Sequence, residues 1–185
     1  MARNTKPNSG KTGTTFQLAI FKTPLGWFGM LGHEGRLQKI HIGQPSRKAV
    51  EDVFRDEWAD ATLELTSWNP DLENRLSRFA RGEVVSFADV ELEWPKPLTS
   101  FRRRVIDQAR RLAWGETATY GELAQRAGSP RAARAVGSTM ATNLFPIVIP
   151  CHRVVASNGG LGGFSAPSGV NLKRQLLSME ADSQA

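Results

Sequence analysis

The sequence predicts a mixed α/β protein built from two unlike halves. In the first half, short apolar runs partly alternate with polar residues and are separated by glycines, a pattern typical of a β-meander. In the second half, apolar residues recur at helical spacing up to the single cysteine. Between them, Pro95 and Pro97 in "EWPKPLTS" interrupt any regular element. We therefore expect an α/β scaffold domain over residues 13–96 and a second domain over residues 97–185.

Composition excludes several classes of protein. The 185 residues, 40% hydrophobic and 23% charged, can build a real hydrophobic core, and no run of about 18 apolar residues predicts a membrane span. The polar start "MARNTKPNSGKTGTT" lacks a secretion signal, so we expect a disordered arm over residues 1–12 and a cytoplasmic protein. One cysteine cannot form an internal disulfide, and the three histidines lack metal-ligand spacing. No metal and no cofactor are therefore expected.

The excess positive charge lies entirely in the second half. The net charge is +6, and residues 97–185 hold eleven Lys and Arg against five Asp and Glu, whereas the first 96 residues hold thirteen of each. A basic half favours a polyanionic partner, while a solvated basic face without a partner is the alternative. Nucleic acid is therefore the first candidate partner.

The first half is expected to form three strands followed by two helices. The strands correspond to "FQLAIFK", "GWFGMLG" and "RLQKIHI". Ser46 can cap the helix of "SRKAVEDVFRDEW", and the helix of "DLENRLSRFARG" ends at Gly82. His33 and His41 are expected on a strand surface or in a loop. Because no catalytic cluster is visible, this half is interpreted as a scaffold.

The second half begins with an arginine-rich helix, "SFRRRVIDQARRLAW", and continues into a helix-turn-helix. Thr119 and Glu122 have capping-box spacing at the start of "TYGELAQRAG", which ends at Gly128. Ser129 then caps a helix that is predicted to begin at Pro130, in "SPRAARAVGSTMATN". Two short helices joined by a tight turn are typical of this motif.

The second helix of the motif has a small and basic outer face. Val136 and Met140 belong to its apolar stripe, and the opposite face carries Arg131, Arg134, Ala135 and Ser138. Small side chains let a helix approach a nucleic-acid groove, and an arginine there can reach inside it. An alanine-rich helix packed against another helix is the alternative. The charge distribution favours DNA.

The only thiol, Cys151, follows an apolar run in "PIVIPCHRVV". Pro146 and Pro150 bracket "IVI", which predicts a short strand that stops at the second proline. A thiol is nucleophilic only as a thiolate and needs a base or positive surroundings. Neighbouring side chains of an extended chain point to opposite sides, so we expect a bridging water between Cys151 and His152. On spacing alone, an inert buried thiol is the alternative.

"IPCHRVV" resembles the active-site signature of the O6-alkylguanine-DNA alkyltransferases, the methylated-DNA–protein-cysteine methyltransferases of direct-reversal DNA repair. The similarity extends through "WGETATYGELAQRAGSPRAARAVGSTMATNLFPIVIPCHRVV", "GGLGGFS" and "LKRQLLSME", nearly all of residues 98–181. The resemblance implies an RNase H-like amino-terminal domain followed by a winged-helix-like domain. It also implies a monomer that needs no cofactor and binds double-stranded DNA containing O6-alkylguanine or O4-alkylthymine.

The resemblance implies a chemical role for five residues. Cys151 matches the alkyl acceptor, His152 the water-relayed base, and Glu180 the carboxylate that orients this base. Tyr120 matches the proton donor to the departing guanine, and Asn143 matches the residue that holds the active-site turn. If His152 and Glu180 activate the thiol, its pKa should lie below the free value of about 8.5.

The resemblance implies DNA and substrate contacts as well. Arg134 matches the finger that fills the space left by the flipped base, because an alkylated base inside a duplex must be extruded before it can react. The implied DNA-binding residues are Tyr120, Arg131, Arg134, Ala135 and Ser138, with the helix-turn-helix in the minor groove. The implied pocket residues are Pro146, Val154, Val155, Phe164 and Ser165.

Some positions depart from the family pattern. Ala141 and Thr142 stand where many members carry basic residues, and Phe164 replaces the more usual tyrosine. The loop over residues 164–171 is longer than usual. Arg103 and Arg104 are candidates to offset the lost charge.

Two other functions compete with repair. An alkyltransferase-like protein would bind the lesion without repairing it, but that class lacks the acceptor cysteine. A winged-helix regulator would use the same helix-turn-helix, but it leaves "PCHRVV" and Glu180 unexplained.

Overall fold

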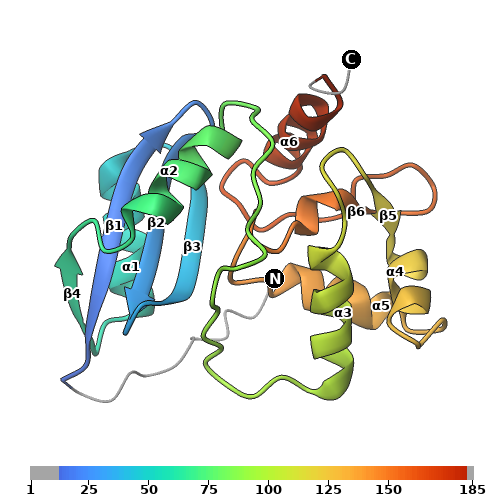
Figure 1. Ribbon diagram of the computed structural model, residues 1–185, viewed down its shortest axis with the longest axis horizontal. Helices are drawn as coiled ribbons and strands as arrows, with labels where there is room; N and C mark the ends of the chain where they lie inside the picture. The colour runs from blue at the N-terminus through green and yellow to red at the C-terminus, as the bar shows by residue number, and fades with distance from the viewer. Residues whose placement is uncertain (1–12, 183–185) are drawn as a thin grey trace.

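The computed structural model describes residues 13–182, so the predicted arm over residues 1–12 lies outside the described residues. A sheet with its helices forms one side of the molecule in Figure 1, and a mainly helical region forms the other. The mixed α/β class predicted from the sequence is confirmed.

The sheet has four strands in the order β3-β2-β1-β4. The predicted meander consists of β1 (Thr15–Thr23), β2 (Gly26–His33) and β3 (Arg36–Gln44), paired antiparallel. A short strand that the sequence analysis missed, β4 (Thr62–Leu65), pairs parallel to β1. Its parallel direction follows from α1, which carries the chain from one edge of the sheet to the other (Figure 1).

Two helices cover opposite faces of this sheet (Figure 1). Helix α1 (Arg47–Glu57) begins after Ser46, as predicted, because the Ser46 hydroxyl accepts a hydrogen bond from the amide of Ala49 at 3.1 Å. Helix α2 (Pro70–Phe79) begins with proline in its first turn after the Asn69 cap. Two hydrophobic clusters result. The smaller one lies under α1 and consists of Phe16, Leu18, Leu31, Val50, Phe54 and Trp58.

The larger cluster continues from the α2 face of the sheet into the second half of the chain. Backbone hydrogen bonds reinforce this junction at the β3 edge: the Leu37 amide donates to Glu91 at 3.0 Å, and the Ile40 amide donates to Leu144 at 2.9 Å. The edge strand is therefore covered by the chain itself.

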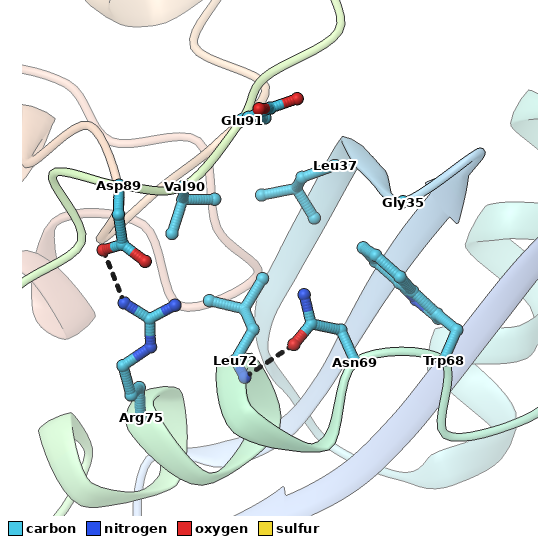
Figure 2. A pocket seen from close by; sticks show the side chains of 9 residues that line it. All are labelled: Gly35, Leu37, Trp68, Asn69, Leu72, Arg75, Asp89, Val90 and Glu91. Atoms are coloured by element: carbon cyan, nitrogen blue, oxygen red, sulfur yellow. Dashed lines mark hydrogen bonds and ion pairs between the residues drawn. The ribbon is translucent and has the colours of Figure 1, made fainter.

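The segment between the halves is also fastened to α2. Figure 2 shows Arg75 of α2 pointing toward Asp89, with Nη1 and Oδ1 2.7 Å apart, at a cavity of about 140 Å³. Leu37, Leu72 and Val90 line the cavity. These contacts hold the middle of the segment over residues 83–99, which crosses the molecule between its two sides in Figure 1.

The second half forms the predicted helices with one shifted boundary. Its elements are α3 (Ser100–Arg110), β5 (Ala118–Thr119), α4 (Tyr120–Arg126), α5 (Ala133–Ala141), β6 (Val154–Val155) and α6 (Val170–Asp182). Helix α5 does not begin at Pro130 as predicted. The Ser129 amide instead closes α4 by donating to Ala124 at 2.9 Å, and residues 129–132 form a turn.

Candidate active site

Cys151 lies directly after a tight turn and not at the end of a strand. The predicted strand over residues 147–149 is wrong, because Ile147 has a φ of 74° and the Ile149 amide donates to the carbonyl of Phe145 at 2.8 Å. Cys151 then begins a short 3₁₀ turn, Cys151–Arg153. Such a φ is uncommon for a β-branched residue, so surrounding contacts must hold it.

Asn143 supplies those contacts. Its Oδ1 accepts from the amide of Phe145 at 3.0 Å, and its Nδ2 donates to the carbonyl of Ile149 at 3.0 Å. The same Nδ2 lies 3.1 Å from Sγ of Cys151, which is 7% exposed. One side chain thus joins both ends of the turn to the thiol.

His152 and Glu180 form a fully buried pair. His152 Nε2 lies 2.8 Å from Oε1 of Glu180, which comes from α6. Arg153 adds two Nε contacts to the carboxylate, at 2.9 and 3.2 Å, and one from Nη2 at 2.8 Å. Its Nη1 donates to the carbonyl of Leu112 at 2.7 Å. The Gly115 amide also donates to Glu180, at 3.1 Å.

This network determines the protonation of His152. Burial alone would raise the pKa of Glu180, but hydrogen bonds from His152 and Arg153 outweigh it and lower the pKa to about 2. Burial lowers the pKa of His152, and Glu180 opposes this only in part. A carboxylate can only accept, so the neutral imidazole carries its proton on Nε2. Its Nδ1 is then a free base, without a hydrogen-bond partner among residues 13–182.

The thiol itself differs from the expectation. Burial raises the pKa of Cys151, and the hydrogen bond from Asn143 and the charge of Lys173 only partly oppose it. The expected pKa below about 8.5 is therefore not what this environment favours. A protonated resting thiol needs a base such as His152 at the moment of reaction.

The site contains a second buried basic side chain. Lys173 of α6 is 0% exposed, and its Nζ donates to the carbonyl of Val154 at 2.6 Å. Burial lowers the pKa of Lys173, while the charge of Cys151 opposes this shift. Neither Lys173 nor Arg153 is predicted as a site residue from the sequence. The spacing of Lys173, Leu176 and Glu180, three and four residues apart, was the available signal of one buried helix face.

Tyr120 approaches the site from α4. Strand β5 pairs parallel with β6, which brings Thr119 opposite Val155 and carries Tyr120 toward the cysteine region. Burial, and then the charge of Cys151, raise the pKa of Tyr120, so the phenol keeps its proton. Gly162 has a φ of 69°, and a Cβ there would overlap the Tyr120 hydroxyl.

The outer face of α5 is exposed: Arg134, Ala135 and Ser138 are exposed, while Val136, Thr139 and Met140 are buried. Arg131, predicted on the same helix face, is exposed in the turn that precedes α5. The predicted pocket residues are spread over several elements. Pro146 and Val154 are buried, Val155 and Phe164 are partly exposed, and Ser165 Oγ donates to the carbonyl of Ala141 at 3.1 Å. The hydroxyl of Ser165 thus ties the long loop to the end of α5.

Two kinds of feature are not found among the described residues. Within residues 13–182, no group of three or more His, Cys, Asp and Glu side chains is arranged to hold a metal ion. Over the same residues, no helix combines the length and apolar character needed to cross a membrane.

A buried thiol with a free imidazole base, next to a helix-turn-helix, defines a protein with a nucleophilic cysteine. A family model described as "6-O-methylguanine DNA methyltransferase, DNA binding domain" matches residues 100–182. A methylated-DNA–protein-cysteine methyltransferase of Methanosarcina acetivorans is 35% identical over 162 residues, 88% of this chain and 96% of that protein. The chain belongs to the methylated-DNA–protein-cysteine methyltransferase family.

Other relatives agree with this assignment. A protein of the same name from Mycobacterium bovis is 40% identical over 164 residues, 85% of this chain and 88% of that one. The crystal structure of Mycobacterium tuberculosis OGT in complex with DNA has a TM-score of 0.71 and 31% identity, covering 90% of this chain and 94% of that chain. The O6-methylguanine-DNA methyltransferase of Pyrococcus kodakaraensis has a TM-score of 0.67 and 28% identity, covering 88% and 98%.

Proposed function

We propose that this protein repairs DNA directly, by moving the alkyl group of O6-alkylguanine, or of O4-alkylthymine, onto Cys151. One observation carries the proposal: Asn143 holds Sγ of Cys151, and the next residue in the chain, His152, has a buried Nδ1 without a hydrogen-bond partner among residues 13–182. Names of the relatives, and a neighbouring structure solved with DNA, support DNA as the partner.

The transfer is a displacement at the alkyl carbon. His152 Nδ1 takes the thiol proton through one water molecule, and Sγ attacks the carbon. The carbon–sulfur bond forms while the bond from that carbon to O6 breaks, and the electron pair leaves with the guanine. Tyr120 protonates the departing guanine, and the imidazolium proton then restores the phenol. The net change is one thiol proton moved to guanine and one alkyl group moved to sulfur.

DNA recognition is assigned to α5. Its small outer face suits close approach to the minor groove, and Arg134 fills the duplex space left when the damaged base is flipped into the pocket. We propose that one chain suffices for this reaction, as a monomer acting on DNA in the cytoplasm. The RNase H-like and winged-helix descriptions, and the domain boundary at residues 96–97, belong to the same proposal.

Each molecule is expected to act once. The product is a thioether, whose carbon–sulfur bond resists hydrolysis, and the chain has no second cysteine to accept the alkyl group. Excess duplex containing O6-methylguanine should therefore give a plateau near one transfer per active protein molecule. Intact-mass analysis should find one methyl group on the wild type and none on Cys151→Ser. Steady product formation beyond one equivalent, or no methyl group on folded wild type, contradicts the proposal.

A further inference from the structure

Three consecutive arginines open α3 at the end of the helix where positive charge is least favourable. Arg102, Arg103 and Arg104 lie near the amino terminus of α3, and the first turn contains no acidic residue. The helix dipole disfavours cations at this end, so stability of α3 itself does not explain them.

The three side chains go to different places. Arg104 Nε donates to the carbonyl of Ala127, the residue that ends α4, at 2.9 Å. Arg102 Nη2 donates to Oγ1 of Thr142, the residue that ends α5, at 2.9 Å. Arg103 instead lines the groove between α3 and the proline-rich segment. Two of the arginines thus lie at the negative ends of the two helices of the helix-turn-helix.

Arg102 places a cation where α5 has none of its own. The last turn of α5 contains no basic residue, and Ala141 and Thr142 are exposed. The Thr142 hydroxyl donates to the carbonyl of Ser138 at 3.0 Å, so the hydroxyl oxygen can at the same time accept the hydrogen bond from Arg102. A neighbouring helix therefore supplies the charge that the end of α5 lacks.

The guanidinium of Arg102 keeps donors for a further ligand. It has five N–H groups, and Thr142 is its only side-chain partner among residues 13–182. Its Nε is buried and has no partner within that part of the chain. Arg134 and Thr142 lie eight positions apart on α5, which is about 12 Å along a helix. An arginine side chain therefore lies near each end of α5.

We propose that Arg102, held by Thr142, binds a DNA phosphate at the carboxyl end of α5. This inference rests on the proposed function, because it takes the outer face of α5 as the surface that meets DNA. A phosphate oxygen is an acceptor that suits the remaining outer N–H groups of the guanidinium. Because Thr142 already orients the Arg102 side chain, that side chain loses less conformational freedom when it binds a phosphate.

The test compares two variants with the same loss of charge on the same helix. Binding of the full chain to an undamaged duplex is measured by fluorescence anisotropy over a series of salt concentrations. Arg102→Gln keeps a hydrogen-bonding side chain near Thr142 but removes the charge. It should reduce the slope of log K against log salt by about 0.9, the loss of one phosphate contact. Affinity at moderate salt should fall about tenfold, by similar factors for different duplex sequences.

Arg103→Gln is the matched control and should leave the slope close to that of the wild type. Both variants should transfer the alkyl group of free O6-benzylguanine at the wild-type rate, because this substrate has no phosphate. An unchanged slope for Arg102→Gln, or an equal reduction in both variants, overturns the inference. If the wild type binds DNA but its Cys151 is never methylated, the proposed function fails instead, and the slopes still report on Arg102.

Discussion

The two halves of the molecule use charge in opposite ways. In the first half, most ion pairs are exposed, such as Lys48 with Asp52 along α1, at 2.8 Å. In the second half, four ionisable side chains near the thiol are buried, each 8% exposed or less: His152, Arg153, Lys173 and Glu180. Exposed pairs contribute little to stability, whereas burying several charged groups is costly even when they are paired.

The contrast between exposed ion pairs in the first half and buried ionisable groups in the second distinguishes the scaffold from the candidate active site. A fold of this size does not need a buried imidazole, guanidinium, ammonium and carboxylate for its stability, because apolar side chains would fill the same space at lower cost. Buried groups with shifted pKa values are typical of functional sites. Here the same network fixes the tautomer of His152 and leaves Nδ1 free, which an apolar core could not do.

The largest expected effect follows from removing the carboxylate. Glu180→Gln leaves Arg153 without its counter-charge and no longer fixes the proton of His152 on Nε2. Alkyl transfer should slow by about a hundredfold or more, and the free energy of unfolding should fall by about 3 kcal/mol. Rapid-quench kinetics on methylated duplex and urea unfolding measure the two effects.

The pH dependence of stability gives an independent check on Glu180. Its pKa is about 2 in the folded chain against 4.5 for the unperturbed group, so the carboxylate stabilises the fold fully above the unfolded value. That contribution is lost as the pH falls from 4.5 toward 2. The wild type should therefore lose more stability over this range than Glu180→Gln. If both proteins lose the same free energy of unfolding over this range, the ionised Glu180 carboxylate does not stabilise the fold.

Much of the scaffold was predictable from local signals, and much of the site was not. Ser46 marks the start of α1 by its own hydrogen bond, whereas β4 becomes a strand only because it pairs with β1. "IVI" has the composition of a strand, but Asn143 forms hydrogen bonds with the backbone of Phe145 and Ile149, and Ile147 between them adopts a left-handed conformation. The apolar composition of the run does not report these side-chain hydrogen bonds, so strand propensity alone gave the wrong prediction.

The buried cations illustrate the same limit. Lys and Arg are rarely buried, so Lys173 in "LKRQLLSME" suggests a solvated helix face. The resemblance identified Glu180 and His152, but the role of Arg153 became visible only from its three contacts with the carboxylate.

Arg134→Ala is expected to have the next largest effect. Arg134 is exposed on α5 and has no assigned part in bond chemistry, so its loss should act on base flipping alone. Flipping a base out of the duplex costs a few kcal/mol, and Arg134 is proposed to offset part of this cost. Without Arg134, repair of a methylated duplex should slow by roughly tenfold or more. The reaction with free O6-benzylguanine should change much less. Equal losses on both substrates would show that Arg134 is not a flipping device.

Lys173→Met should have a smaller effect on repair, exerted through the reactivity of the thiol. The ammonium of Lys173 lowers the pKa of Cys151, so its replacement should raise that pKa further and shift alkylation by iodoacetamide to higher pH. At neutral pH the rate should fall several-fold, and it should recover as the pH is raised. If a folded variant has the same pH profile as the wild type, Lys173 does not lower the pKa of Cys151, and its role is the hydrogen bond to Val154.

The smallest effect on repair is expected from the first half. Glu57 of α1 pairs with Lys39 at 2.6 Å and with His41 at 2.9 Å, on the edge strand β3. Burial would raise the pKa of Glu57, but these two partners outweigh it and lower the pKa below 4.5. Glu57→Gln should reduce the free energy of unfolding by about 1 kcal/mol at neutral pH. This difference should shrink as the pH falls below 4.5, because only the wild type then loses an ionised carboxylate. Methyl transfer measured on the same samples should be unchanged; a slowed transfer would show that the scaffold and the site are coupled through β3.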